Sequence, residues 1–117
     1  MEKVAERLIR YVKENTTSDP ESTSYPSTEG QTIFMKKLAA ELKKIGLNDV
    51  EIDQHSYLTA TIPANGMEDA PVVGFIAHVD TSPDFPGENV NPQLIENYNG
   101  APVQLKNSVT IDPKEFP

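Results

Sequence analysis

Two residues in this sequence have the types and the spacing for chemistry: His78 and Asp80, separated only by Val79. Side chains alternate along an extended chain, so this spacing places the imidazole and the carboxylate on the same side. An imidazole can be a metal ligand, a general base or a hydrogen-bonded structural residue. A carboxylate beside it would fix the ring orientation and raise its basicity. The residue types alone leave all three roles open.

Other polar positions are weaker candidates. His55 lies in a polar turn beside Asp53, and Ser82 has no accompanying base at a recognisable spacing. The tract 87–92 lacks the glycine spacing of a phosphate-binding loop. We interpret His55 and three loop carboxylates as solvated side chains; the carboxylates are Asp69, Asp84 and Glu88.

The element expected to position His78 is a strand over residues 72–77. The run is short, apolar and bounded by turn signals, which is typical of a strand buried on both faces. His78 and Asp80 then lie at the carboxyl end of this strand, where open α/β sheets hold their ligands.

Two helices are predicted before this strand. The first covers residues 2–15, with Val4, Leu8, Tyr11 and Val12 at helical spacing. A polar loop covers 16–28. The second helix starts near Thr28, which resembles a capping box with Gln31, and ends at Gly46. Its apolar stripe consists of Phe34, Leu38, Leu42 and Ile45, with Ile33 alongside.

Further strands are predicted at 50–53 and 57–62 around a turn at 54–56, with Leu58, Ala60 and Ile62 facing inward. Weaker strand signals occur at 103–105 and 109–111. This order predicts an α/β layered fold, a mixed sheet with helices packed on it. A strand that is apolar on both faces requires helices on both faces, so two helices leave the architecture incomplete.

Composition narrows the possible partners and compartments. The net charge of −8 argues against nucleic acid and anionic membranes, which bind basic patches. No cysteine is present, which excludes disulfides and thiolate metal sites. No apolar window reaches the roughly 18 residues of a membrane span, and the N-terminus is charged where a signal peptide is apolar. We expect a soluble cytoplasmic protein of one domain.

The run His78-Val79-Asp80-Thr81-Ser82-Pro83 resembles the His-x-Asp-x-x-Pro signature of the di-zinc exopeptidases and deacylases related to carboxypeptidase G2. Three longer tracts, 74–93, 26–31 and 60–65, resemble the tripeptide aminopeptidases of that family. The similar tracts are spread over most of the chain in the same order. The resemblance covers all of this sequence but only the N-terminal part of such an enzyme.

This resemblance implies a zinc-dependent enzyme that removes the N-terminal residue from tripeptides, with two zinc ions that share a bridging water. It implies that His78 is a ligand to one zinc. It also implies that Asp80, which we group with the catalytic residues, orients His78. The family's other ligands and its general base match nothing between residues 84 and 117.

We therefore expect residues 1–117 to be the N-terminal part of a zinc-peptidase catalytic domain, whose substrate is a small peptide. We expect this chain to be inactive alone, because catalytic zinc takes three protein ligands plus water. The alternative is a non-catalytic binding or dimerisation module, in which an exposed strand edge pairs with a second copy to form a homo-oligomer. Within the enzyme class, a dipeptidase or an acyl-amino-acid deacylase is a further option.

Overall fold

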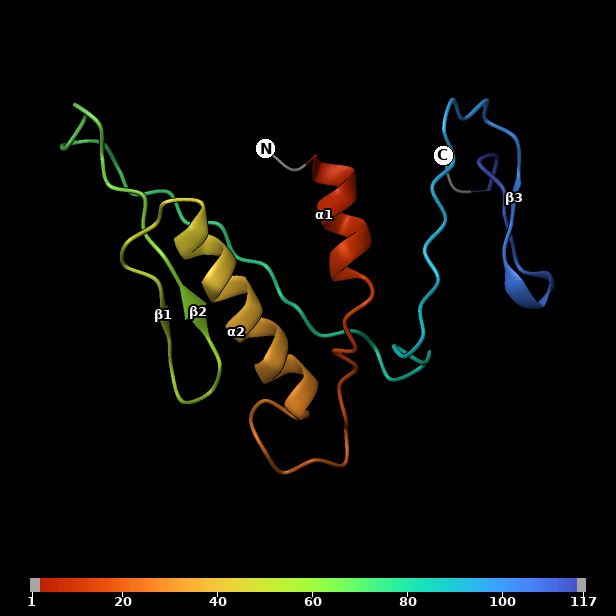
Figure 1. Ribbon diagram of the computed structural model, residues 1–117, viewed down its shortest axis with the longest axis horizontal. Helices are drawn as coiled ribbons and strands as arrows, with labels where there is room; N and C mark the ends of the chain where they lie inside the picture. The colour runs from red at the N-terminus through yellow and green to blue at the C-terminus, as the bar shows by residue number, and fades with distance from the viewer. Residues whose placement is uncertain (1–2, 116–117) are drawn as a thin grey trace.

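The computed structural model describes residues 3–115 and contains the helices and strands of a small α/β chain (Figure 1). In chain order the elements are α1 (Val4–Tyr11), α2 (Glu29–Lys44), β1 (Glu51–Ile52), β2 (Leu58–Thr59), β3 (Val103–Gln104), the 3-10 turn η1 (Lys106–Ser108) and β4 (Thr110–Ile111). The four strands form two separate two-stranded sheets. Within residues 3–115, no helix is long and apolar enough to cross a membrane.

The second helix, α2, begins and ends where the sequence predicts. Thr28 is its N-cap residue, and Gly46 follows its last turn at φ 109°. The amide of Gly46 donates to the Lys43 carbonyl oxygen, and the amide of Leu47 donates to that of Leu42, both at 3.1 Å. This pair of bonds is the Schellman motif, in which a glycine takes the left-handed position.

The capping box predicted at the start of α2 is wrong. The Thr28 hydroxyl makes no capping bond and donates instead to the Thr17 carbonyl oxygen at 2.9 Å. The Gln31 side chain donates to the Thr16 carbonyl oxygen at 3.3 Å. Both side chains thus bind the preceding loop and not their own helix.

A small core lies between the two helices and the first hairpin. Its buried apolar residues are Phe34, Ala39 and Val50. Charged contacts also join the helices, because Arg7 and Arg10 of α1 pair with Glu41 of α2 at 3.0 and 2.9 Å.

The apolar stripe predicted for the first helix is confirmed only in part. Tyr11 packs on Phe34, but Val4 and Leu8 are exposed, because α1 turns its arginines toward α2. The helix is also shorter than predicted and ends at Tyr11; Glu2, part of that prediction, lies outside the described residues.

The predicted first hairpin is present with shorter strands, and the two weaker strand signals near the end of the chain pair with each other. β1 and β2 are antiparallel, with Ile52 opposite Leu58. The second strand ends early because the amide of Thr61 donates to the Asp49 carboxylate at 3.0 Å and not to a neighbouring strand. Ala60 and Ile62, predicted to face inward, are therefore exposed. β3 and β4 form the other antiparallel pair, with η1 as their turn.

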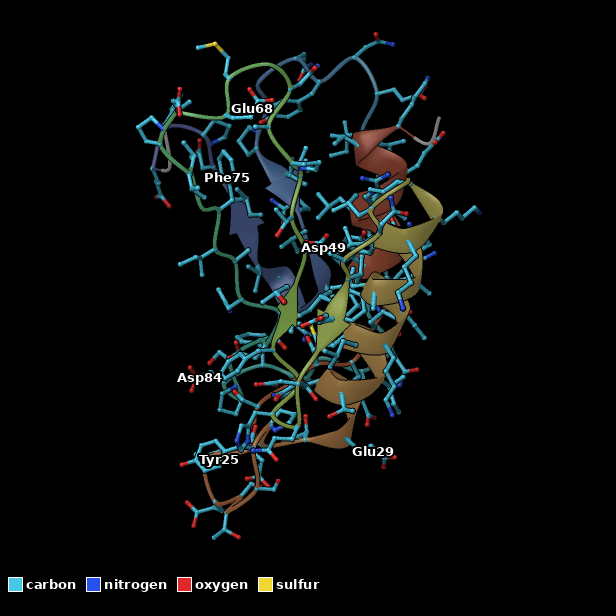
Figure 2. All side chains as sticks on the ribbon, turned by 90° about the vertical axis from the view of Figure 1, so that its left-hand side faces the viewer. Tyr25, Glu29, Asp49, Glu68, Phe75 and Asp84 are labelled. Atoms are coloured by element: carbon cyan, nitrogen blue, oxygen red, sulfur yellow. The ribbon has the colours of Figure 1, made fainter. Side chains whose placement is uncertain are left out.

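The buried strand predicted at 72–77 is not formed. These residues have no assigned strand, and the side chains of Phe75 and Ile76 are 95% and 100% exposed. Phe75 lies on the side of the molecule away from both helices (Figure 2). The run has the composition of a buried strand, but within residues 3–115 no neighbouring strand covers it.

The chain is expanded for its length. Its radius of gyration is 18.0 Å, whereas a compact domain of this size has about 13 Å. The segment that carries β3 and β4 lies apart from the two helices (Figure 1). The helices, the first hairpin and the segment around residue 80 therefore form the part that positions the candidate site.

Candidate functional site

His78 and Asp80 meet as their spacing predicts. The Nδ1 atom of His78 lies 2.9 Å from Oδ1 of Asp80, within hydrogen-bond distance. The His78 side chain is 83% exposed and that of Asp80 is 48% exposed. The imidazole is therefore held by a carboxylate on one nitrogen and is accessible to a ligand on the other.

The backbone beyond this pair is fixed by a segment that the sequence predicts to be only a loop. Thr17 and Thr81 form an isolated parallel β-bridge. The amide of Thr81 donates to the Thr16 carbonyl oxygen at 3.2 Å, and the amide of Ser18 donates to the Thr81 carbonyl oxygen at 3.0 Å. The loop before α2 thereby holds the chain next to the candidate site.

A groove of about 660 Å³ lies beside His78. Its lining is mostly apolar and comes from the end of α1 and the segment after it, from α2, and from residues 77–79 and the loop that follows them; the apolar members include Tyr11, Val12, Phe34, Leu38, Phe85 and Val90. His78, Thr81 and Ser82 supply polar atoms at its wall. An imidazole at the wall of an apolar groove can act on a ligand that is partly removed from water.

The pair has the chemistry of one zinc ligand and the carboxylate that orients it. Zinc binds a neutral imidazole nitrogen, and a carboxylate on the other ring nitrogen is the usual orienting partner. A full site needs more donors, and among residues 3–115 no group of three His, Cys, Asp or Glu side chains could hold a metal ion. The described residues therefore supply one oriented ligand and not a complete coordination sphere.

The other predicted candidates lie elsewhere or serve local structure. His55 is in the turn between β1 and β2, where its amide donates to Asp53 at 2.9 Å. Ser82 donates to the Asp84 carboxylate at 2.6 Å. Asp84, predicted to be a solvated side chain, therefore has a hydrogen-bond partner in the protein. It is labelled in the lower part of Figure 2. Asp69 is exposed.

Three residues around the site were missed by sequence reasoning. Asn15 donates to the Glu88 carboxylate at 3.3 Å, and Thr16 and Gln31 are buried polar residues that bind one another. Only the polar tract after the first helix hints at them. The contacts that tie them to other segments join residues 15 or more positions apart, so no local pattern identifies them.

Comparison with known proteins gives a relationship over the full length of the chain. No family model matches it. The chain is 50% identical over 119 aligned residues to "Peptidase T" of Caldanaerobacter subterraneus subsp. tengcongensis and to "Peptidase T" of Halothermothrix orenii, which covers 100% of this chain in both cases. It is also 50% identical, over 117 residues, to "Peptidase T" of Bacillus licheniformis.

The chain spans about 29% of the length of the first two relatives and 28% of the third. The similarity runs along the whole chain at this identity, which confirms the resemblance found in the sequence. The chain is thus a homologue, from end to end, of part of the proteins named peptidase T.

Proposed function

We propose that residues 1–117 are the N-terminal part of the catalytic domain of a zinc-dependent tripeptide aminopeptidase, acting in the cytoplasm. The observation that carries the proposal is the hydrogen-bonded pair of His78 and Asp80, with an accessible imidazole. The similarity of the whole chain to about 29% of the length of proteins named peptidase T supports it. In this proposal the substrate is a small peptide.

His78 would hold one zinc ion through Nε2, because Nδ1 is directed at Asp80. When bound, zinc polarises a peptide carbonyl and lowers the pKa of water. Asp80 keeps the proton of the imidazole on Nδ1 and fixes the plane of the ring. The apolar groove beside His78 would exclude water from that side of the site.

We propose that the remaining ligands and the general base belong to parts of a longer protein, so that this chain alone does not cleave peptides. Two features support this. The described residues contain no group of three His, Cys, Asp or Glu side chains that could hold a metal ion. The chain also spans only 29% of the length of its first relative. In the same proposal, the exposed run 72–77 becomes an inner strand of a layered zinc-exopeptidase fold.

The experiment compares the intact gene product with its His78→Ala and His55→Ala variants, each stripped of metal and reloaded with zinc. His55 is the matched control, because it lies in a turn away from the groove. We expect His78→Ala to bind one zinc fewer and to lose at least about 10³-fold in kcat/KM for a tripeptide. We expect His55→Ala to match the unmodified protein.

Three results would overturn parts of the proposal. Full activity in His78→Ala would contradict the assignment of His78 as a zinc ligand. Faster cleavage of dipeptides or acyl-amino acids than of tripeptides would replace the substrate class. Tripeptide cleavage by the isolated 117-residue chain would contradict its proposed inactivity.

A second candidate is a non-catalytic module that forms a homo-oligomer through residues 72–77. The exposure of Val72, Phe75 and Ile76 favours it, since an exposed apolar segment of β-prone residues can pair with the same segment of another chain. Sedimentation of the 117-residue chain over a range of concentrations tests it. A dimer that Phe75→Lys dissociates supports the module, and a monomer at all concentrations excludes it.

A further inference from the structure

Thr16 binds the backbone on both sides of Asp80. Its hydroxyl donates to the Val79 carbonyl oxygen at 2.7 Å. Its carbonyl oxygen accepts from the amide of Thr81 at 3.2 Å. One residue therefore fixes the two peptide groups that determine where the Asp80 carboxylate points.

This contact is directional and half-buried, and it starts from a buried residue. Thr16 is 3% exposed, the least exposed of the buried polar residues among those described. A hydrogen bond that is partly removed from water is stronger than one in water, and an acceptor that loses its donor there loses part of its stabilisation. The hydrogen bond from Thr16 thus restrains the position of the Val79 carbonyl oxygen.

Thr16 is itself held by the start of α2. The side-chain amide of Gln31, which is buried, donates to the Thr16 carbonyl oxygen at 3.3 Å and to the Ser27 hydroxyl at 3.2 Å. The Thr28 hydroxyl binds the next carbonyl oxygen, that of Thr17. The loop is therefore attached to the most regular element of the chain.

Two glycines allow the segments to approach closely. A Cβ atom on Gly30 would overlap the carbonyl oxygen of Asn15. A Cβ atom on Gly87 would overlap the Thr17 hydroxyl and lie 2.9 Å from Oδ1 of Asn15. Residues 15–17 are thus enclosed on two sides, which limits the positions open to Thr16.

We propose that Thr16 is a positioning residue for His78. The path runs from Gln31 through Thr16 to the peptide between Val79 and Asp80, and from the Asp80 carboxylate to Nδ1 of His78. Thr16 acts through the backbone and touches no reacting group. The inference rests on the proposed function in one respect, that the oriented imidazole serves as a zinc ligand.

The test compares Thr16→Val, Thr16→Ser and Thr32→Val in the intact gene product. Valine has the shape of threonine without the hydroxyl, and serine keeps the hydroxyl. Thr32 is the matched control, since its hydroxyl also makes a half-buried bond, 3.0 Å from that of Ser56, away from the site. The readouts are zinc affinity by competition with a chelating indicator, and the imidazole tautomer of the metal-free protein by nitrogen-15 NMR.

We expect Thr16→Val to weaken zinc binding about 10- to 100-fold, the usual effect of losing a group that orients a ligand. The neutral ring should also change from one Nδ1–H tautomer to a mixture. The zinc affinity of Thr16→Ser should stay within about threefold of that of the unmodified protein, because serine keeps the hydroxyl donor. Thr32→Val should match the unmodified protein in both zinc affinity and tautomer. Zinc affinity and tautomer that are the same in Thr16→Val and Thr32→Val would overturn the proposal.

The outcomes separate this inference from the proposed function. If the unmodified protein binds zinc and His78→Ala binds one zinc fewer, an unchanged Thr16→Val contradicts the role of Thr16 alone. If the unmodified protein binds no zinc, the proposed function fails, and the tautomer still decides whether Thr16 orients His78. If Thr16→Val does not fold, the Gln31→Met variant tests the proposal instead. This substitution removes the side-chain amide that holds Thr16, and it should change zinc affinity and tautomer in the same direction by a smaller amount.

Discussion

The ring of Tyr11 meets the ring of Phe34 edge to face, with centroids 5.4 Å apart and planes inclined at 76°. This contact joins α1 to the buried side of α2, and both rings line the groove beside His78. Edge-to-face aromatic pairs add about 0.5–1.5 kcal/mol to the free energy of burial. The pair therefore stabilises one wall of the candidate site.

Replacing Phe34 by alanine should lower the free energy of unfolding by about 3 kcal/mol, because it opens a cavity and removes the contact with Tyr11. Urea unfolding measures the change. Phe85→Ala is the control, since Phe85 is mostly exposed, and it should change the free energy of unfolding by less than about 0.5 kcal/mol. Equal losses in the two variants would show that Phe34 is not part of a core.

The pairing of Glu41 should make stability depend on pH. Burial alone would raise the pKa of Glu41, but hydrogen bonds from Arg10 and Tyr11, together with the positive charges of Arg10 and Arg7, outweigh it and hold the pKa below its ordinary value. The ionised carboxylate thus favours the folded state above the unfolded pKa. This stability is lost as pH falls through the folded pKa.

Glu41→Gln should therefore be less stable than the unmodified protein by about 1 kcal/mol at neutral pH, and equally stable in acid where both side chains are neutral. Chemical unfolding at several pH values tests this. The exposed Glu96→Gln serves as the control. A deficit in Glu41→Gln that stays constant from neutral to acid pH would contradict the prediction.

Gly30→Ala should lower the free energy of unfolding by about 1–3 kcal/mol, the usual result of overpacking, because the added methyl group overlaps the Asn15 carbonyl oxygen. Amide hydrogen exchange should quicken at Thr81, whose amide is bonded to the same loop. Gly74→Ala is the matched control, since nothing lies within 4 Å of its Cβ position. Unchanged exchange at Thr81 in Gly30→Ala would show that the loop does not need this close approach.

Asp53→Ala should weaken the turn of the first hairpin. The Asp53 carboxylate accepts hydrogen bonds from the amides of His55 at 2.9 Å and Tyr57 at 2.8 Å. Losing them should cost about 1 kcal/mol and quicken exchange of the Asp53 amide, which is bonded to the Tyr57 carbonyl oxygen. Asp69→Ala, at an exposed loop position, should change neither quantity.

Local patterns predict local structure well in this chain. The end of α2 at Gly46 and the meeting of His78 with Asp80 both follow from spacing within a few residues, and both are confirmed. The Thr28 and Gln31 pattern predicts a cap that does not form. Its side chains have better partners in a loop more than ten residues earlier, which a local pattern cannot reveal.

The run 72–77 marks a different limit of sequence reasoning. Its apolar residues indicate that this run needs to be buried, but they do not identify which part of a protein buries it. The same holds for Val4 and Leu8 of α1, which have helical spacing and remain exposed. The candidate site follows the same rule, since the His78 pair is predictable and the role of Thr16, which depends on distant partners, is not.

The exposed run also bears on the solubility of this chain at high concentration. Residues 72–76 are β-branched, aromatic or glycine, and carry no charge. An uncharged, β-prone segment with accessible backbone is the pattern from which cross-β fibrils nucleate. We therefore expect the 117-residue chain, purified alone, to aggregate through this segment, and we expect a charge placed at Gly74 to reduce that aggregation.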